Sequence, residues 1–348
     1  MSIVEVTGQR SVDLIADARK LMQQHRHDEA ILLLTRFRRQ QPDAAVERLL
    51  AQCRYQAYLL QPPQSQLADP WANPLTDPFA ELNGVPEINA SELSSATLTA
   101  GIRQHGALLV RGLLPRANAN YLAVGIRESL DACQAWHENG QGAANSPWYS
   151  RLPLQEGSEI ADARPWVESA GGVWLADSPR MLYEMTELLD QHGITEVIAG
   201  YFGERPMLSV GKSTLRCVPG TQGQADWHQD GAFMGTDIRS VNLWLSLSDC
   251  GYDASGLEYL PRRLDRVLPT GSHGANFEWS VGPGMVKEAA NGLATVSPVF
   301  APGDALLFDH FFLHRTGAPA AISKPRYAIE SWFFAPSAYP AQQVPLRI

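Results

Sequence analysis

The chain has 348 residues, of which 45% are hydrophobic, and a formal net charge of −9. A chain of this length can bury one large core, and its acidic balance excludes broad binding to nucleic-acid phosphates, which requires a basic surface. No apolar run approaches the roughly 18 residues that a membrane-spanning helix needs, so no membrane span is expected.

The first residues and the cysteines favour a cytoplasmic protein. The opening stretch, MSIVEVTGQRSVDLIADARK, carries charges where a secretory signal would need an apolar run. The cysteines are scattered and form no C-x-x-C pair, which predicts reduced thiols and disfavours a cysteine-based zinc site; they are Cys53, Cys133, Cys217 and Cys250.

Residues 1–60 are predicted to be helical, because apolar residues recur there at helical spacing. Pro42 interrupts the pattern, and Asp43 suits the start of a new helix. The stretch resembles a tetratricopeptide unit, but one unit buries too little to stand alone. We therefore expect a helical hairpin packed on the main domain. The alternative is a surface that docks a partner, such as a carrier protein that holds the substrate.

The middle of the chain is predicted to contain a linker and then the main domain. Residues 61–78 hold five prolines and indicate an extended linker, so the main domain should span 79–348. In it we expect a helix capped by Ser94 or Ser95, a strand at 107–110, helices at 117–136 and 180–202, and a long loop at 137–170. Aromatic residues at 136–174 are candidates for a lid over the substrate, with core packing as the alternative: Trp136, Trp148, Tyr149, Trp166 and Trp174.

Beyond about residue 207 the pattern changes to short β-rich runs separated by turns. The runs include SVNLWLSLSDC (240–250), ATVSPVF (294–300), ALLFDHFFLH (305–314) and YAIESWFF (327–334). Serial short strands predict a sandwich or barrel. Because helices come first and strands later, we expect an α+β fold in which helices pack around a jelly-roll core.

The segment DWHQDGAFMG (226–235) holds the first candidate metal ligands. In a strand, or in the tight turn after it, residues two apart point the same way, so His228 and Asp230 can converge on one cation while Gln229 faces elsewhere. An imidazole with a carboxylate suits Fe(II), Mn(II) or Zn(II). An isolated H-x-D triplet is weak evidence, and a third ligand has to complete the site.

Three histidines of the β-rich region are candidates for that third ligand. His314 follows an apolar run and precedes the turn-like RTGAP, so we expect it at the end of a strand that opens into a cavity. His310 shares its strand parity, although an ordinary histidine between aromatic residues is the simpler interpretation. His273 lies in a glycine-rich loop and is expected in solvent or beside the substrate entrance.

Arg326 is the second decisive residue. It stands twelve positions beyond His314 and opens an apolar strand, which we expect to run antiparallel to the strand that ends at His314. That arrangement would bring the guanidinium into the same cavity, where its planar fork can bind a carboxylate in bidentate fashion. A surface arginine is the plainer alternative.

The set His228-x-Asp230, His314 and Arg326 resembles the Fe(II)/2-oxoglutarate-dependent oxygenases of the phytanoyl-CoA dioxygenase-like family. That group has a W-H-x-D segment, a distal histidine followed by a small polar run, and an arginine about a dozen residues on. Softer matches appear in family order over roughly residues 80–340, and residues 1–60 lie outside them. These matches are HGALLVRGLL (105–114), GLEYLPRR (256–263) and APGDALLFDHFFLHRTG (301–317).

The resemblance implies a double-stranded β-helix of the cupin-like type, with His228, Asp230 and His314 binding Fe(II) near one mouth. It also implies that 2-oxoglutarate and O₂ are co-substrates. The far carboxylate of 2-oxoglutarate would pair with Arg326, and Thr316 would be its hydroxyl partner.

Further contacts to 2-oxoglutarate are sought on neighbouring strands. Strand alternation puts Asn242 on one face with Trp244, so Asn242 is a candidate donor to the inner carboxylate. Arg216 and Thr214, with Lys212 just upstream, are further candidates. For each of these, an ordinary polar residue of a strand is the alternative.

The implied reaction is hydroxylation of an unactivated C–H bond in a small organic or natural-product substrate, with release of succinate and CO₂. Related halogenases replace the carboxylate ligand with a small residue, and the presence of Asp230 favours hydroxylation. Desaturation or cyclisation by the same chemistry, or a cupin-type metalloenzyme that does not use 2-oxoglutarate, are the alternatives. Neither the substrate nor the oligomeric state can be deduced from the residues, since a shared fold fixes no substrate.

Overall fold

The computed structural model describes residues 3–60, 71, 76–140, 146–156, 158–220, 224–319, 322–340 and 342–348. The helices of this part of the chain are α1 (Ile3–Gln23), α2 (His27–Gln40), α3 (Ala44–Leu59), α4 (Ser95–Ala100), α5 (Arg116–Asn139), α6 (Arg164–Ser169), α7 (Pro179–Gln191), α8 (Ile194–Phe202), α9 (Gly231–Met234) and α10 (Pro283–Ala290). Its strands are β1 (Glu87–Asn89), β2 (Ala107–Arg111), β3 (Gly172–Trp174), β4 (Met207–Ser209), β5 (Thr214–Val218), β6 (Ser240–Ser246), β7 (Gly256–Tyr259), β8 (Ala305–Phe308), β9 (His314–Gly317), β10 (Arg326–Phe334) and β11 (Pro345–Arg347). Most of the predicted linker, at 61–70 and 72–75, lies outside the described residues.

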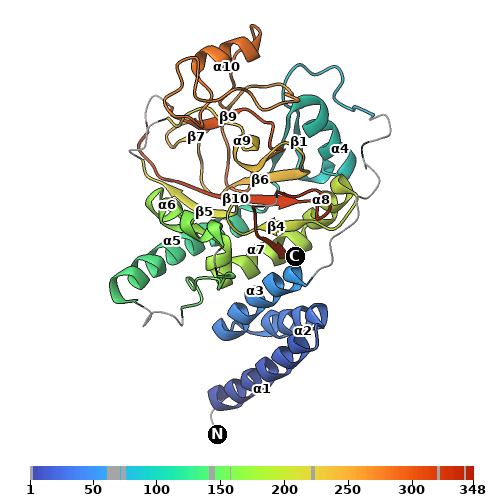
Figure 1. The fold of residues 1–348 in the computed structure, drawn as a ribbon, viewed down its shortest axis with the longest axis vertical. Helices are drawn as coiled ribbons and strands as arrows, with labels where there is room; N and C mark the ends of the chain where they lie inside the picture. Colours follow the sequence, from blue (N-terminus) through green and yellow to red (C-terminus); the bar gives the residue numbers. More distant parts are fainter. Residues whose placement is uncertain are drawn as a thin grey trace.

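Two sheets form the centre of the molecule. The large sheet has the order β1-β2-β8-β6-β10-β4-β11, and β5 pairs with both β10 and β3. Apart from the parallel pair β1–β2, its strands are antiparallel, as are β7 and β9 of the small sheet. Figure 1 shows the large sheet across the middle, with β7, β9 and α10 above it and α1–α3 below.

The large sheet is buried on both faces, which is why β6 reads as a nearly continuous apolar run. One face, with Leu243 and Phe333, packs on side chains of α7 and α8. The opposite face, with Trp244 and Phe308, packs on Leu257 and its neighbours in the small sheet. Helices thus cover one face of the large sheet, and the small sheet packs on the other. The predicted α+β jelly-roll fold is confirmed.

Several local predictions are confirmed by capping and strand contacts. The side chain of Asp43 accepts hydrogen bonds from the backbone N–H groups of Ala45 and Val46 and so starts α3. Ser94 caps α4, and the strand predicted at 107–110 is β2.

Three predictions about secondary structure are wrong. The single helix expected at 180–202 is split into α7 and α8, because Gly193 adopts a left-handed φ of 68° that separates them. The loop expected at 137–170 includes the end of α5 and the helix α6, which has a proline in its first turn. The run 294–300 forms isolated bridges rather than a strand, since Val296 and Phe300 each pair at a single position.

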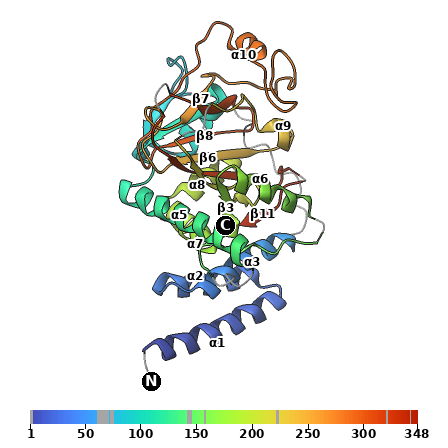
Figure 2. The same cartoon turned by 90° about the vertical axis from the view of Figure 1, so that its left-hand side faces the viewer.

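The N-terminal helices are joined to the main body by buried charges. Glu47 on α3 is fully buried and accepts hydrogen bonds from Arg38 on α2 and from Arg180 on α7, the latter at 2.9 Å. Arg54 on α3 donates to the carbonyl of Arg347 in β11 at 2.9 Å. Figure 2 shows α3 lying directly beneath α7 and β11. The N-terminal segment thus has three helices rather than a two-helix hairpin, and α3 packs on the core of the main domain.

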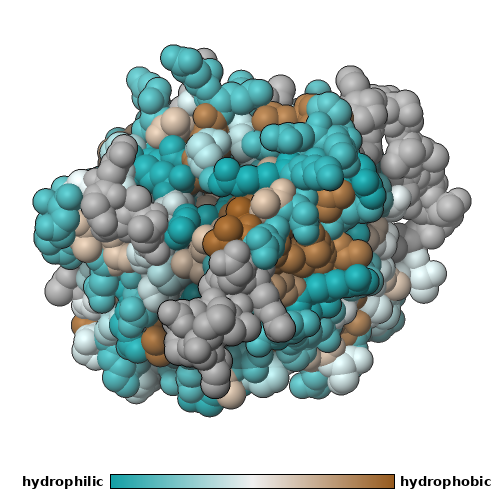
Figure 3. Space-filling model, turned by 90° about the horizontal axis from the view of Figure 1, so that it is seen from below, coloured by the Kyte–Doolittle hydropathy of each residue, from teal (hydrophilic) through white to brown (hydrophobic). Residues whose placement is uncertain are grey.

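The surface on the N-terminal side is mostly hydrophilic, with apolar side chains gathered in one area (Figure 3). Val12 on α1 and Leu32 on α2 are exposed large apolar residues of this part of the chain. Among the described helices, none is long and apolar enough to cross a membrane.

We predict that Glu47→Gln lowers the free energy of unfolding by about 3 kcal/mol, because it leaves the buried Arg38 and the half-buried Arg180 without their common carboxylate. Urea denaturation followed by circular dichroism measures the change. Glu29→Gln on α2 is the matched control, since the ion pair of Glu29 with Arg26 is exposed and its loss should change nothing measurable. Equal destabilisation by both changes would contradict the prediction.

Candidate metal centre

His228 and His314 are brought together by the backbone. They form an antiparallel bridge in which His228 N–H donates to the His314 carbonyl at 3.0 Å and His314 N–H donates to the His228 carbonyl at 3.1 Å. Residues directly opposite each other in such a pair project their side chains to the same face. The two imidazole rings consequently lie side by side, with 4.4 Å between their centroids.

The second nitrogen of each ring fixes its tautomer. Nδ1 of His228 lies 3.1 Å from the carbonyl oxygen of Asp226, and Nδ1 of His314 lies 3.0 Å from that of Phe312. A carbonyl accepts only from a protonated nitrogen, so Nδ1 carries the hydrogen and Nε2 keeps a free lone pair. Burial, together with the neighbouring His228, lowers the pKa of His314 to about 4. At neutral pH His314 is therefore an uncharged donor of the kind that metals bind.

Asp230 completes the group from the turn after His228. Its carboxylate oxygen Oδ2 lies 3.9 Å from Nε2 of His314, and its Oδ1 accepts from the Lys212 ammonium at 2.9 Å. Burial alone would raise the pKa of Asp230, but Lys212 and the two histidines outweigh it and hold the pKa well below its usual range. One candidate ligand atom from each of the three residues lies within 4.8 Å of the others. We call His228, Asp230 and His314 the metal group. Two imidazoles and one ionised carboxylate match the donor set of non-haem Fe(II) sites.

The residues next to Asp230 hold the turn in place. Gln229 points away from the metal group and is fully buried; its amide donates to the carbonyl of Phe311, and its oxygen accepts from Leu268 N–H. Gly231 donates its N–H to the His310 carbonyl, and an added Cβ there would lie 2.6 Å from Val267. From the sequence, Gln229 was predicted only to face away from the metal. In the structure its side chain also holds the turn in place through these hydrogen bonds.

The other two candidate histidines do not join the group. His310 is buried, with one ring nitrogen 2.9 Å from the Ser240 hydroxyl and the other 3.3 Å from the Thr236 carbonyl, so both nitrogens have partners. His273 lies in the loop before α10, with one ring nitrogen 2.9 Å from the Ser272 hydroxyl. The simpler interpretation of His310 is confirmed by these contacts.

Arg326 lies inside the molecule, although not for the reason expected. His314 begins β9 rather than ending a strand, and β10 pairs with β4, β5 and β6, so the predicted pairing of the two strands is wrong. Arg326 instead crosses between the sheets, where its Nη1 donates to the Gly256 carbonyl at 3.0 Å. Because Gly256 is opposite Gly317 at the end of β9, this contact still places Arg326 near the strand of His314.

The guanidinium of Arg326 is 1% exposed, and its Nε has no hydrogen-bond partner among the described residues. Burial lowers its pKa. A buried donor without a partner costs stability, so an acceptor supplied by a bound molecule would stabilise this position. A carboxylate of a bound molecule is such an acceptor.

Glu330 links this arginine to the metal group. It lies four residues along β10 on the same face, and Arg216 donates to it at 3.0 Å. Burial raises its pKa, but the charges of Arg216 and Arg326 outweigh this and lower it, and the charge of Asp230 is close enough to act on it as well. The charges of the guanidinium and of the metal group therefore both act on Glu330.

The remaining candidates lie on β5, β6 and β9. Asn242 is on the inner face of β6, opposite Trp332, and its Oδ1 is buried without a partner. Thr316 lies two residues after His314 in β9, and Thr214 is buried in β5 opposite Glu330. Arg216 is already engaged by Glu330 and by the Ala170 carbonyl, which favours the structural alternative for this residue.

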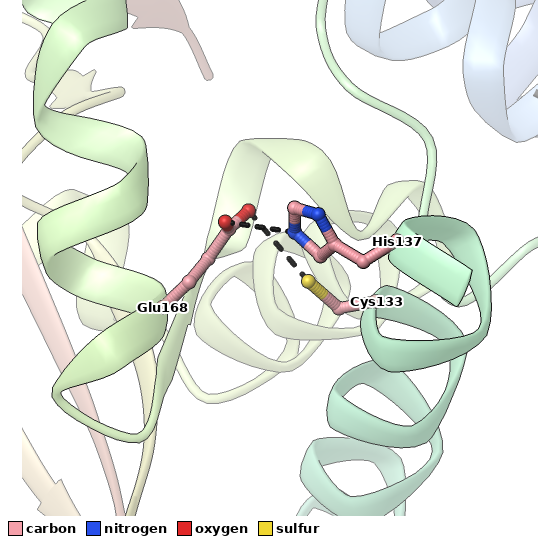
Figure 4. A group of neighbouring side chains, drawn as sticks. All are labelled: Cys133, His137 and Glu168. Carbon is pink, nitrogen blue, oxygen red and sulfur yellow. Dashed lines mark hydrogen bonds and ion pairs between the residues drawn. The ribbon is translucent and has the colours of Figure 1, made fainter. Parts of the chain in front are cut away.

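A second group of potential ligands within the described residues is Cys133, His137 and Glu168, drawn in Figure 4. Glu168 there accepts from Cys133, His137, Tyr149 and Arg151, so both of its oxygens are occupied by the chain. Burial raises the pKa of Cys133 to about 12, which keeps the thiol protonated. The group is satisfied as a hydrogen-bond network, in contrast to Asp230, whose Oδ2 remains free.

The sequence model of the phytanoyl-CoA dioxygenase (PhyH) family matches residues 102–321, which is more than half of the chain. The chain belongs to this family. Enzymes of the family use Fe(II), 2-oxoglutarate and O₂, and these are the metal and co-substrates of this chain. The donor set described above fits the metal, and the unsatisfied Arg326 fits a dicarboxylate. No curated protein sequence shows a significant match.

Solved structures with a similar fold are distant in sequence. The epimerase SnoN, in complex with Fe³⁺, α-ketoglutarate and nogalamycin RO, is 15% identical, with a TM-score of 0.46 over 71% of this chain and 86% of that one. EctD from S. alaskensis, with 2-oxoglutarate and 5-hydroxyectoine, is 16% identical, with a TM-score of 0.46 over 70% and 78%. The non-haem monooxygenase ThoJ is 16% identical, with a TM-score of 0.47 over 72% and 84%. The family membership rests on the sequence match alone.

The aromatic residues expected to form a lid in this PhyH-family chain are mainly core residues. Tyr149 and Trp174 are buried, Trp136 and Trp148 pack against buried clusters, and Trp166 is exposed. The exposed aromatic side chains beside the metal group are others, in α9 and in the loop before α10, which the sequence did not single out.

We predict that Glu168→Gln destabilises the protein at pH 7 and that the difference from the wild type shrinks in acid. Burial raises the pKa of Glu168, but Tyr149, Arg151 and His137 together lower it below its ordinary value of 4.5. The stabilisation is therefore complete above about pH 4.5 and is lost as the pH falls further, through the lower pKa of the folded state. Thermal melts of both proteins between pH 3 and 8, in steps of roughly one unit, measure this difference.

The control for this prediction is Glu138→Gln, which removes the same charge from an exposed position of α5 that accepts from the neutral Gln134. A difference between wild type and Glu168→Gln that stays constant down to the acid limit would show that the carboxylate charge is not what stabilises the network.

Proposed function

We propose that the chain is an Fe(II)/2-oxoglutarate-dependent hydroxylase that acts on an unactivated C–H bond of a small organic substrate, with His228, Asp230 and His314 as its iron ligands. The observation that supports the ligand set most directly is the reciprocal backbone bridge between the two histidines, with a free Nε2 on each ring and Asp230 beside them. The bound iron supplies the activation of O₂ that is coupled to oxidation of 2-oxoglutarate to succinate and CO₂.

The binding of 2-oxoglutarate is assigned to Arg326, with Thr316 and Asn242 as further contacts. The unsatisfied Nε of Arg326 offers a donor to the far carboxylate, and Thr316 lies on the strand that Arg326 approaches through Gly256. Asn242 has a buried amide atom without a partner, and since the two ends of an amide are interchangeable by rotation, that position can carry a donor. Thr214 and Arg216 are weaker candidates, since Thr214 stands in β5 opposite Glu330 and Arg216 is held by Glu330.

Hydroxylation is favoured over halogenation because Asp230 keeps a carboxylate in the metal group. Lys212 fixes one oxygen of that carboxylate, so the other is oriented toward the two imidazoles. Asp230 and His314 are buried, which keeps bulk water from the reacting atoms. Desaturation and cyclisation need the same ligands, and product analysis distinguishes them from hydroxylation.

A cupin-type enzyme that does not use 2-oxoglutarate is the second candidate. It would leave Arg326 as a buried guanidinium with an unsatisfied donor and no function, which is an unfavourable arrangement for the fold alone. Succinate formation that depends on both Fe(II) and 2-oxoglutarate separates the two candidates.

We predict that anaerobic addition of Fe(II) and 2-oxoglutarate to the metal-free protein produces a metal-to-ligand charge-transfer band in the visible spectrum. His314→Ala and Asp230→Ala should abolish the band, because each removes one of three ligands. His310→Asn is the matched control, since His310 is a buried histidine nearby with both nitrogens engaged. A band that persists in His314→Ala would refute the ligand assignment.

We predict that Arg326→Met keeps the affinity for Fe(II) but weakens 2-oxoglutarate binding by about a hundredfold or more, since a charge-assisted bidentate pair is lost. Competition for Fe(II) with a chromophoric chelator measures the first quantity, and titration of the charge-transfer band measures the second. Arg315→Met is the control, because Arg315 is on β9 but pairs with Glu258. Equal effects of the two changes would remove Arg326 from the co-substrate site.

Docking of a partner through the N-terminal helices stays a hypothesis. The exposed Val12 and Leu32 could contribute to such a surface, while the buried contacts of α3 have a structural function. Turnover that is unchanged when both exposed residues are replaced by serine, on free and on carrier-bound substrate, would remove it.

A further inference from the structure

Three large aromatic side chains gather on the surface beside the proposed iron ligands. Phe277 and Trp279, in the loop before α10, are stacked with 5.4 Å between their ring centroids and 6° between their planes. Phe233, in α9, lies 5.8 Å from Trp279. We call Phe233, Phe277 and Trp279 the aromatic cluster. Figures 1 and 2 show α10 above the small sheet, at the opposite end of the molecule from α1–α3.

The aromatic cluster contacts the metal group directly through Trp279 and indirectly through Phe233. The ring of Trp279 lies 6.1 Å from that of His228 and meets it edge-on. Phe233 follows Asp230 by three residues, and the Lys212 ammonium lies 4.9 Å from the centre of its ring. Lys212 also donates to Asp230, so Lys212 connects Phe233 to the metal group.

The aromatic cluster is more exposed than the other aromatic side chains that contact the metal group. Phe277 is 53% exposed, Phe233 42% and Trp279 38%, whereas Phe308 and Phe312, which contact His314, are buried. Large apolar side chains that are adjacent and exposed mark a binding surface in globular proteins, since water contact is unfavourable for them. The position next to His228 makes this surface part of the approach to the metal.

The loop that carries Phe277 and Trp279 is fixed to the metal motif. Val281 N–H donates to the Trp227 carbonyl at 2.8 Å, and the Asn276 amide donates to the Asp226 carboxylate at 2.6 Å. These contacts flank the two rings in sequence and join them to the residues just before His228. The rings are thus held in position before any ligand arrives, which lowers the entropy cost of binding.

We propose that the aromatic cluster is the substrate-binding surface of the enzyme and that it selects a flat, unsaturated ring system, which stacks on Phe277 and Trp279 and so presents a neighbouring C–H bond to the metal. The presentation of a C–H bond to the metal rests on the proposed function, whereas the binding of a flat ring does not. Stacked and edge-to-face ring contacts favour planar π-systems over puckered saturated rings of equal size. Specificity then comes from these side chains rather than from the iron ligands.

The test compares 2-naphthol with decahydro-2-naphthol, two neutral alcohols of the same skeleton that differ in flatness and in π-electrons. Equilibrium dialysis against the metal-free protein measures both affinities without requiring iron or turnover. We expect 2-naphthol to bind about tenfold more tightly than the saturated alcohol. Trp279→Ala and Phe277→Ala should each remove most of that preference, and the conservative Trp279→Phe should retain it.

Trp166→Ala is the matched control, since Trp166 is 68% exposed on α6, away from α10 in both views of the ribbon. Circular dichroism checks the folding of each variant, and Trp279→Phe keeps the test valid if an alanine variant does not fold. Equal binding of the two alcohols, or a 2-naphthol affinity unchanged in both alanine variants, overturns the proposal.

Two further measurements separate this inference from its alternatives. Sedimentation that shows a wild-type dimer and a Trp279→Ala monomer would make the cluster a contact between copies of the chain and overturn the proposal. The Fe(II)/2-oxoglutarate band, recorded on the same proteins, should still form in Phe277→Ala, because Phe277 has no contact with the three ligands among the described residues. A missing band in a wild type that still prefers 2-naphthol counts against the iron assignment and in favour of the ring-binding surface.

Discussion

The pairing of two backbone segments more than eighty residues apart is the constraint on which the site depends. Two hydrogen bonds between residues 228 and 314 set the separation of the imidazoles before any side-chain preference acts. The local carbonyls then choose the tautomer, and the turn into α9 delivers Asp230. The metal group is thus a product of sheet register. A slip of one residue would send one imidazole to the opposite face.

The inner face of the large sheet combines apolar packing with charges that would be costly in an ordinary core. Trp244 and Phe308 fill one part of it, while Arg216, Glu330 and Arg326 stand on neighbouring positions. Arg216 and Glu330 form an ion pair, whereas Nε of Arg326 has no hydrogen-bond partner among the described residues. Charge left unmatched on a buried face indicates a binding function rather than a structural one.

The chemistry of the candidate site could be predicted from the sequence more fully than its construction. His228 and Asp230 were identifiable because residue type and short spacing are local properties, and His314 because it follows an apolar run and precedes a turn-like segment. The strands that pair with β10 could not be predicted in this way, since strand order depends on how the whole chain folds. The aromatic cluster was missed because Phe277 and Trp279 lie in a loop without periodicity, positioned by the contact of Asn276 with Asp226. The break at Gly193 needed a backbone angle that apolar spacing does not reveal.

The contact between α3 and β11 has a consequence for the biosynthesis of the chain. Arg54 meets the carbonyl of Arg347 across 293 positions of sequence, and Arg347 also pairs with Asp28 on α2. The helices leave the ribosome early, yet the strand on which they rest is translated only after the whole catalytic region. Until then the part of α3 that packs with β11, which includes Tyr55, is uncovered in the nascent chain, although α2 and α7 already cover other parts of the helix.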